Sequence, residues 1–568
     1  MGEYDRDFSV WLEKAIEDPD LTEELLSIQG NEDEIMDRFY RELAFGTGGL
    51  RGVIGAGENR MNIYTVRRAT QGLADYLNAK CSAPSVAISF DSRIKSDLFA
   101  KEAARVLAGN GIRVHIFDTL QPTPVLSFAV RYFKCDGGLM LTASHNPAKY
   151  NGYKCYGADG CQMTDFDAGE VTKFISKVRI FDDVKLADFS SELISHMGSD
   201  VLEAFYDAIM ARRVYPGICA ESGLKLVYTP LNGTGNVPVR EILSRLGLND
   251  VTVVKEQEMP DGNFPTVPYP NPEIPDVFVI GKELAASVDA DMILATDPDC
   301  DRLGIAVRDS DGSYKLMTGN EVGCLLLNYV LEGRTEMGTL PKDPVAVTTI
   351  VSSEMSGPIA DKYGCEVRRV LTGFKYIGEQ IGFLEAEGHE ERFVFGFEES
   401  YGYMAGGYVR DKDGVVASML ICEAAAYYKS KGLTLLEQMQ KLYDEFGAYR
   451  DKLINTVFEG AAGMTAMAEL MASIRREPPT SFGPLNIVSF ADYKNKVKTN
   501  LIDGSKQELT LPSSNVLAFV LEDGSDIIIR PSGTGPKIKV YILARAETVA
   551  EADEKVVKLT EAAKILLK

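Results

Sequence analysis

Strand-like and helix-like segments alternate along the first three quarters of this chain. Residues 86–93 have the apolar character of a buried strand, and residues 96–111 have the spacing of an amphipathic helix that ends in glycine. Residues 112–118 are strand-like again, and the same order returns from residue 224 and from residue 344. Because such units build α/β folds, the pattern predicts three related α/β domains, with chance recurrence as the alternative.

The pattern changes after about residue 455. A methionine-rich helical segment leads into shorter strands, among them residues 515–533 and 537–545, and a further helix follows. This order predicts a smaller α+β domain of a different kind. At roughly 150 residues per domain, 568 residues also correspond to about four domains. We therefore expect four domains, at 1–210, 211–325, 326–455 and 456–568.

Composition and charge narrow the class of protein. A hydrophobic fraction of 45% and a charged fraction of 25% are ordinary for a globular chain. The net charge of −23 disfavours nucleic acid and anionic membrane surfaces as partners, since both need a basic footprint. The nine cysteines are scattered without a C-x-x-C pair, which indicates reduced thiols, and we find no signal peptide or membrane-spanning run. We expect a cytoplasmic protein with no nucleic-acid and no membrane partner.

The segment LTASHNPAKYNGYK places a serine where a buried strand should end. Pro147 and the following Asn-Gly pair favour turns, so the Ser144 hydroxyl should lie on a rigid loop. A hydroxyl is a poor nucleophile until a neighbour takes its proton or a cation stabilises charge. His145 and Lys154 are the local candidates for that help. We interpret Ser144 as a phosphoryl-carrying serine; an ordinary strand-to-turn connection is the alternative.

The segment MILATDPDCDRLGIAV carries three alternating aspartates between two apolar strands. Asp297, Asp299 and Asp301 would repel one another unless a hard divalent cation lies between them. The loop is not an EF-hand, because Arg302 and Arg308 stand where glycine and glutamate are required. Few protein ligands and an open side favour Mg²⁺, and Arg302 can hold a phosphate beside it. An acidic surface turn is the alternative.

Three further segments can bind a substrate. The glycine-rich run at 44–52 fits neither the dinucleotide fingerprint nor the P-loop, and Arg51 is its strong donor. In GFEESYGY, Glu398 and Ser400 are suited to contact neighbouring sugar hydroxyls. In IIIRPSGTGPKIKVY, a strand leads into a loop that can ring an anion with the side chains or backbone amides of Arg530, Ser532, Gly533, Thr534, Gly535 and Lys539. A flexible turn, a surface glutamate pair and an ordinary hairpin are the respective alternatives.

Together, the motifs TASHNP, DPDCDR, GFEES and RPSGTG occur in this order, one in each expected domain. In this combination the chain resembles the α-D-phosphohexomutase superfamily, and most closely the long-chain phosphoglucomutases. The resemblance implies three related mixed α/β sandwich domains and a C-terminal α+β domain around a central cleft. It also implies that Ser144 is phosphorylated at rest and that its phosphate shares Mg²⁺ with the three aspartates.

In similar enzymes, the phosphoserine gives its phosphoryl group to a sugar monophosphate and takes back the other phosphoryl group from the resulting bisphosphate. Glucose 1,6-bisphosphate would then be intermediate and activator. The resemblance implies catalytic roles for Ser144, Arg51, His145, Lys154 and Lys412. It implies metal binding by Ser144, Asp297, Asp299 and Asp301. It implies substrate binding by Arg302, Gly373, Lys375, Glu398, Ser400, Arg530, Ser532, Gly533, Thr534, Gly535 and Lys539.

Two departures from the family pattern matter. Gly48 stands where a serine is frequent, which removes one hydroxyl without changing Arg51. No histidine follows Ser400, so a histidine base is in doubt, and Lys412 in VRDKDG matches a lysine assigned to proton transfer.

The expected reaction is the interconversion of glucose 1-phosphate and glucose 6-phosphate. Mannose or pentose phosphates as substrates, a sugar-bisphosphate synthase, and a silent phosphosugar-binding regulator are the alternatives. A monomer or weak dimer is expected.

Overall fold

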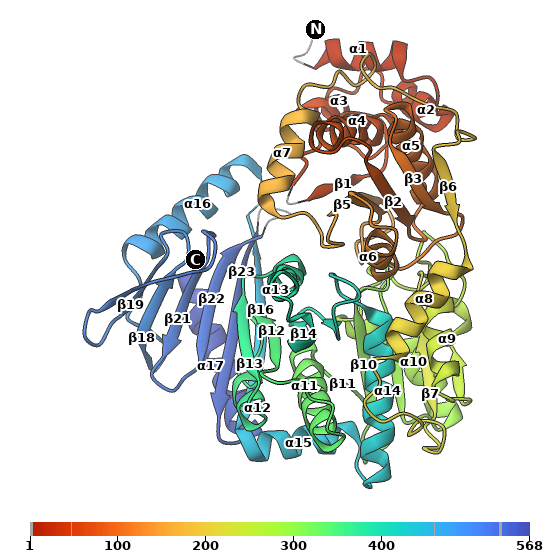
Figure 1. Cartoon of the computed structure of the whole chain (residues 1–568). Helices are drawn as coiled ribbons and strands as arrows, with labels where there is room; N and C mark the ends of the chain where they lie inside the picture. Colours follow the sequence, from red (N-terminus) through yellow and green to blue (C-terminus); the bar gives the residue numbers. More distant parts are fainter. Residues whose placement is uncertain (1–3, 47, 459, 533–536, 568) are drawn as a thin grey trace. The chain divides into compact units, whose positions relative to one another are not determined.

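The computed structural model describes residues 4–46, 48–458, 460–532 and 537–567 (Figure 1). The chain forms two compact units. The first comprises Met1–Met317, Gly378–Glu391 and Gly402–Ser430, and the second comprises Thr318–Ile377, Arg392–Tyr401 and Lys431–Lys568. Three mixed α/β domains and a C-terminal antiparallel sheet domain make up the chain, so the predicted fold class is confirmed. No helix in the described part is long and apolar enough to cross a membrane.

The first sheet of the first unit has six strands. Their order is β1 (Gly49–Val53), β5 (Tyr150–Gly157), β4 (Gly137–Leu141), β2 (Ser85–Phe90), β3 (Arg113–Phe117) and β6 (Ile194–Met197). Strands β4, β2, β3 and β6 are parallel, whereas β5 is antiparallel to β1 and β4. Helices α4 (Ile63–Lys80) and α5 (Ser96–Gly109) lie on one side of this sheet and α6 (Thr123–Tyr132) on the other (Figure 1). The continuous burial of β2 and β4 follows from this double cover.

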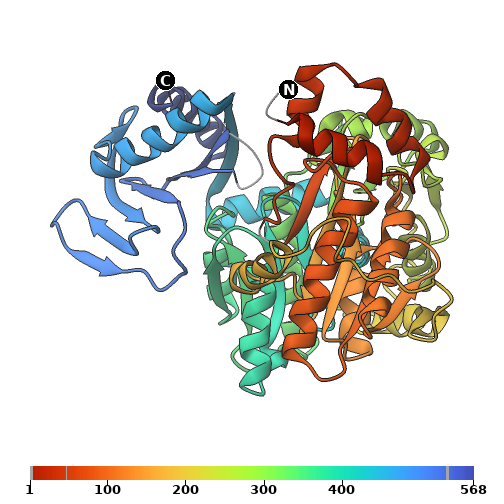
Figure 2. The same ribbon diagram turned by 90° about the horizontal axis from the view of Figure 1, so that it is seen from above.

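Three short helices precede the first sheet. Helices α1 (Asp5–Lys14), α2 (Pro19–Ser27) and α3 (Glu32–Phe39), red in Figures 1 and 2, lie together beside α4. Trp11 of α1 is buried between Phe39, Tyr64 and Phe181, with ring centroids 5.3–5.9 Å away. Helix α4 itself begins with a capping box in which Asn62 and Thr65 satisfy each other's backbone amides. The core of this domain therefore extends from the sheet through α4 to the N-terminal helices.

A second sheet completes the first unit. Its order is β11 (Tyr314–Leu316), β10 (Leu303–Arg308), β9 (Met292–Thr296), β7 (Leu226–Thr229) and β8 (Val251–Val253). Strands β9 and β10 are antiparallel, and the pair Thr296 and Leu303 closes the ladder next to the connecting loop. The helices of this region are α8 (Ser199–Met210), α9 (Asn236–Arg245), α10 (Val279–Val288) and α14 (Gly414–Ser430), whereas α7 (Asp165–Ile175) packs against α4 beside the first sheet. The tight β9–β10 connection fixes residues 297–302, which carry the three aspartates.

The second unit begins with parallel strands. Strand β12 (Val345–Thr349) lies between β13 (Glu366–Val370) and β14 (Phe393–Glu398). Helices α11 (Gly319–Glu336), α12 (Ser356–Lys362) and α15 (Leu435–Phe446) belong to this unit. Helix α13 (Phe374–Ala386) begins in it, and the chain passes to the first unit at Gly378.

The C-terminal sheet of the second unit is antiparallel throughout. Its order is β16 (Ala448–Val457), β23 (Lys537–Ala546), β22 (Asp526–Pro531), β21 (Leu517–Leu521), β18 (Leu485–Asp492), β19 (Val497–Asn500) and β20 (Lys506–Glu508), and β17 (Ser481–Phe482) pairs with β18. Helices α16 (Gly460–Arg476) and α17 (Val549–Leu566) contribute Met471, Ile474 and Leu559 to its core. Strand β16 spans the position between 455 and 456 at which the sequence places a domain boundary.

Candidate active site

Ser144 lies on the loop that joins β4 to β5. Strand β4 ends three residues earlier, at Leu141, and Ser144 is buried with a φ of 52°, in the left-handed region. Its backbone N–H donates to Thr142 Oγ1 at 2.8 Å. Its hydroxyl donates to Asp297 Oδ2 at 2.9 Å and lies 3.1 Å from His145 Nδ1. The fold thus brings the predicted serine directly to the predicted aspartate loop, 153 residues further along the chain.

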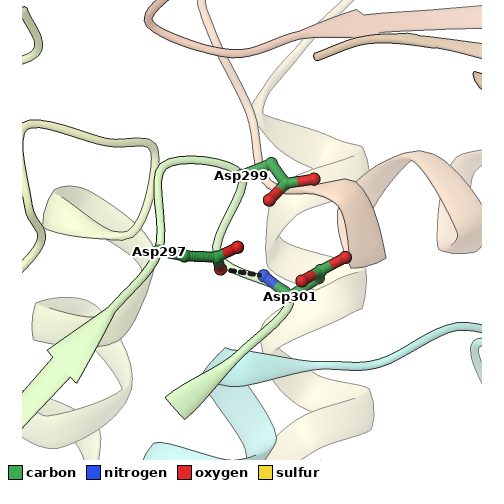
Figure 3. A group of neighbouring side chains, drawn as sticks. All are labelled: Asp297, Asp299 and Asp301. Carbon is green, nitrogen blue, oxygen red and sulfur yellow. Dashed lines mark hydrogen bonds between the residues drawn. The ribbon is translucent and has the colours of Figure 1, made fainter. Parts of the chain in front are cut away.

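The three aspartates of the β9–β10 loop converge. Asp297, Asp299 and Asp301 are all buried, and one ligand atom of each lies within 4.8 Å of the others (Figure 3). The backbone N–H groups of Asp301 and Arg302 donate to Asp297 Oδ1 at 3.1 and 3.0 Å. Burial and the charges of the other two carboxylates raise the pKa of Asp297 well above its usual value. The cluster is therefore a site of concentrated negative charge.

Two lysines partly offset this charge. Lys154 of β5 lies with its Nζ 2.8 Å from Asp299 Oδ2 and 3.5 Å from Asp301 Oδ2. Lys412 lies with its Nζ 3.1 Å from Asp301 Oδ2. Although burial lowers the pKa of Lys154, the charges of Asp299 and Asp301 raise it above its usual value overall. Both predicted lysines thus lie against the aspartates.

The donor set fits a hard divalent cation. Among the described residues, Oδ1 of Asp299 and Oδ1 of Asp301 are buried without a hydrogen-bond partner. Buried carboxylate oxygens are costly when unsatisfied, and oxygen ligands of this kind are what Mg²⁺ binds. The acidic cluster is therefore consistent with a metal site.

The other predicted side chains of the first unit, Arg51, His145 and Arg302, differ in exposure, charge and partners. Arg51 is exposed on β1, paired in register with Gly152 of β5. Burial and the charges of Arg302 and Arg51 keep the pKa of His145 well below its usual value, so the imidazole is neutral. The Arg302 guanidinium, predicted to hold a phosphate, forms an ion pair with Glu273 in this structure.

Side chains that the sequence reasoning missed complete the site. Tyr156 donates to Asp411 Oδ2 at 2.7 Å, and Asp411 Oδ1 accepts from the backbone N–H of Lys412 at 2.8 Å and lies 3.2 Å from its Nζ. Thr123 at the start of α6 donates its hydroxyl to Asp299 Oδ2 at 2.9 Å. Tyr156 follows Lys154 by two residues, and alternate side chains of a strand lie on the same face. This spacing in the sequence could have indicated that Tyr156 lies near the site.

The predicted sugar-contacting residues belong to the second unit. Glu398 ends β14 and is buried, and the Ser400 hydroxyl donates to its Oε1 at 2.9 Å. Gly373 has a φ of 122°, which glycine tolerates, directly before α13, and the Lys375 Nζ lies 5.2 Å from the ring centroid of Tyr376. Glu398 and Ser400 thus form a hydrogen-bonded pair at a strand end.

The predicted phosphate cradle is described in part. Arg530 of β22 and Lys539 of β23 are directly paired in register and half-buried. The backbone N–H of Ser532 donates to the carbonyl of Lys537 at 2.8 Å. The remaining three predicted members, Gly533, Thr534 and Gly535, lie outside the described residues. Because directly paired residues of antiparallel strands project from the same side of a sheet, the two cationic side chains share one face.

Known proteins of one family match most of the chain. Models of the phosphoglucomutase/phosphomannomutase family match residues 42–179 (alpha/beta/alpha domain I), 203–312 (domain II) and 318–446 (domain III). A phosphoglucomutase of Staphylococcus haemolyticus is 37% identical over 517 residues, 91% of this chain and 93% of the relative. A phosphoglucomutase of Staphylococcus aureus strain USA300 is 35% identical and covers 97% of this chain and 98% of the relative.

Solved structures show the same fold. A putative phosphomannomutase from Thermus thermophilus superposes with a TM-score of 0.69 at 23% identity, over 93% of this chain and 99% of that one. The phosphoglucomutase pp63/parafusin from Paramecium superposes with a TM-score of 0.67 at 18% identity, over 92% and 96%. With matched domain models over more than half of its length and relatives above 30% identity along nearly all of it, this chain belongs to the phosphoglucomutase/phosphomannomutase family.

Proposed function

We propose that this chain is a phosphoglucomutase, an intramolecular phosphotransferase that interconverts α-D-glucose 1-phosphate and glucose 6-phosphate. The observation that carries the proposal is the hydrogen bond of 2.9 Å between the Ser144 hydroxyl and Asp297, within a buried cluster of three carboxylates and two lysines. That arrangement gives one hydroxyl both an acceptor for its proton and a concentrated electrostatic field. Relatives that match nearly the whole chain carry the same activity in their names.

In the proposed reaction, Ser144 carries a phosphoryl group at rest and gives it to the free hydroxyl end of a hexose monophosphate. The product is glucose 1,6-bisphosphate, which turns around and returns its other phosphoryl group to Ser144. The enzyme is thereby recharged, and the isomeric monophosphate leaves. Glucose 1,6-bisphosphate accordingly acts as intermediate and as activator of an unphosphorylated enzyme.

The residues of the first unit would hold the transferring group. Asp297, Asp299 and Asp301 would hold Mg²⁺ together with the Ser144 phosphate, and the ion would supply charge stabilisation for the transferred group. Lys154 and the exposed Arg51 would add positive charge beside it. Lys412 would exchange a proton with the sugar hydroxyl.

The residues of the second unit would bind the sugar. Glu398 and Ser400 would contact hydroxyls near the middle of the ring, which occupy similar places in both orientations of the substrate. Gly373 and Lys375 would form a second sugar contact. The non-reacting phosphate would be bound by the cradle of Arg530, Ser532, Gly533, Thr534, Gly535 and Lys539. Arg302, which belongs to the first unit, would add a further phosphate contact. A cytoplasmic location and a monomeric or weakly dimeric state remain predictions of the sequence.

Intact-protein mass spectrometry with peptide mapping, followed by coupled assays with Mg²⁺, tests the proposal. We expect one phosphoryl group on the Ser144 peptide, restored by glucose 1,6-bisphosphate after removal. Ser144→Ala should abolish turnover, whereas Ser190→Ala, at an exposed hydroxyl bonded to Asp188, should not. An enzyme that cannot be charged on Ser144 would exclude this mechanism. Equal rates on mannose and glucose phosphates would exclude a glucose-selective enzyme.

A further inference from the structure

Ser144 has a backbone conformation that needs support. A φ of 52° is uncommon for a residue with a side chain and costs on the order of 1 kcal/mol or more. The surrounding structure must supply contacts that hold this conformation, because a relaxed backbone would point the hydroxyl elsewhere. Those contacts come from Asp91 and Arg93, two charged residues in the segment that follows β2, and neither has a role in the proposed reaction.

Arg93 holds the carbonyl side of the loop. Its side chain is fully buried, and its Nη2 donates to the Ser144 carbonyl at 2.5 Å and also to the Asn146 carbonyl. Its Nη1 donates to the carbonyls of Pro147 and Tyr150 at 3.0 and 2.9 Å. One guanidinium therefore binds four carbonyl groups between residues 144 and 150. The planar fork of arginine permits this, and the single ammonium group of lysine does not.

Asp91 holds the amide side of the same residue. Its Oδ2 accepts the Thr142 hydroxyl at 2.6 Å, and Thr142 Oγ1 in turn accepts the Ser144 N–H at 2.8 Å. Its Oδ1 accepts the backbone N–H of Arg93 at 3.0 Å and the Ser96 hydroxyl at 2.8 Å. The Arg93 Nε lies 3.4 Å from Asp91 Oδ2, and both side chains are fully buried. Both peptide groups of Ser144 are thus fixed by one buried ion pair.

The following domain covers this ion pair. The Phe264 ring centroid lies 5.0 Å from the Arg93 guanidinium carbon, and Phe264 is itself buried. At Gly262, a Cβ atom would come within 2.5 Å of the Ile94 backbone nitrogen, so the two segments are in close contact. The Arg93 guanidinium is therefore shielded from bulk water by this segment.

We infer that Arg93, together with Asp91, is a positioning device that fixes Ser144 for phosphoryl exchange; the inference rests on the proposed function of Ser144. In this exchange, the Ser144 oxygen transfers a phosphoryl group to one end of the sugar and accepts one from the other end. The oxygen must therefore keep the same position while the substrate turns around. A misplacement of about 1 Å at such a centre can cost about a hundredfold in rate. Arg93 and Asp91 touch neither substrate nor metal in this assignment and act only through the loop.

The test compares folded variants in the complete enzyme. Arg93→Lys should lower kcat by about a hundredfold while KM changes little, because ground-state binding of the sugar does not depend on the loop. The 31P NMR resonance of its phosphoserine should shift or broaden. Arg67→Lys is the matched control, since Arg67 forms a buried ion pair with Glu102 away from the loop. It should be destabilised to a similar degree and keep the wild-type kcat and resonance.

Two milder variants keep the inference testable if Arg93→Lys does not fold. Thr142→Val removes the hydroxyl between Asp91 and the Ser144 amide, and Asp91→Asn removes the charge while it keeps the shape. Both should lower kcat about tenfold, with KM little changed. A folded variant of Arg93, Asp91 or Thr142 with wild-type kcat and resonance would overturn the inference. Wild-type enzyme without phosphoserine or mutase activity would instead overturn the proposed function.

Discussion

At the scale of single residues, Lys412 is held by carboxylates on two sides. Its Nζ lies 3.1 Å from Asp301 and 3.2 Å from Asp411. Asp411 is oriented in turn by the Tyr156 hydroxyl. Although burial raises the pKa of Asp411, the charges of Lys412 and Lys154 lower it below its usual value, so the carboxylate is ionised. A lysine proposed to move a proton is thus kept in place by a fixed negative partner.

Removal of the Tyr156 hydroxyl should therefore slow the reaction. In Tyr156→Phe, Asp411 loses a donor and Lys412 loses a fixed neighbour, so we expect kcat to fall about tenfold. The matched control is Tyr153→Phe, three positions earlier on the same strand, whose hydroxyl contacts Thr70 at 3.0 Å. Each variant should lose about 1 kcal/mol of stability. Equal kcat values for the two variants, measured by a coupled assay, would contradict the role of this tyrosine.

Glu399, between the two predicted sugar-contacting residues, should make stability depend on pH. Burial and the charge of Glu398 raise its pKa from 4.5 to about 7, against the opposing charges of Arg530 and Lys539. The folded state thus holds this proton more tightly than the unfolded chain does. Unfolding then releases a proton between about pH 4.5 and 7, and the contribution of Glu399 to stability falls as pH rises through this window.

Glu399→Gln should remove this pH dependence. The variant should gain up to about 3 kcal/mol over wild type at pH 8 and little at pH 4.5. Urea unfolding at both pH values measures the difference. Glu469→Gln, at an exposed position on α16, is the control and should follow wild type at each pH. A wild-type advantage at pH 8 would mean that the Glu399 carboxylate is stabilised when charged.

At the scale of elements, the helices α1–α3 form a layer that precedes the matched family models, which begin at residue 42. Trp11 is the single tryptophan of the chain and is 1% exposed, so its fluorescence reports on this layer. Trp11→Ala should lower the free energy of unfolding by about 3–5 kcal/mol through the cavity it leaves. Trp11→Phe should cost less, and KM should stay unchanged in both variants. If calorimetry showed Trp11→Ala to be as stable as the wild type, the packing of helices α1–α3 would not contribute to the stability of the fold.

Much of this arrangement could be predicted from single elements. The β-α-β order and the change of pattern near residue 455 predicted the fold class, because the period of apolar residues is a local property. The motifs indicated the family, which the relatives confirm. The hydrogen bonds that join Tyr156 to Asp411, and Arg93 to the Ser144 loop, could not be predicted. They join residues 255 and 51 positions apart, and no local pattern specifies such pairs.

At the scale of the whole molecule, the proposed ligands fall on different units. The three aspartates, Ser144 and both lysines lie in the first unit, whereas Glu398, Ser400, Arg530 and Lys539 lie in the second. A ligand stabilises the parts of a protein that bind it in the folded state, by about 2.7 kcal/mol at a hundred times its Kd. Each ligand should therefore leave a distinct pattern in thermal unfolding.

Calorimetry of the full chain can separate the two patterns. Trp11 is buried in the first unit, so the change in its fluorescence on heating identifies the unfolding of that unit. Mg²⁺ alone should raise the melting temperature of this transition. Glucose 1-phosphate with Mg²⁺ should raise both transitions, because the substrate would bind residues of both units. In Asp299→Asn, the effect of Mg²⁺ should be lost, whereas Asp311→Asn, at an exposed turn, should retain it. If the sugar phosphate raised only the first transition, Glu398, Ser400 and the cradle of the second unit would not be its binding residues.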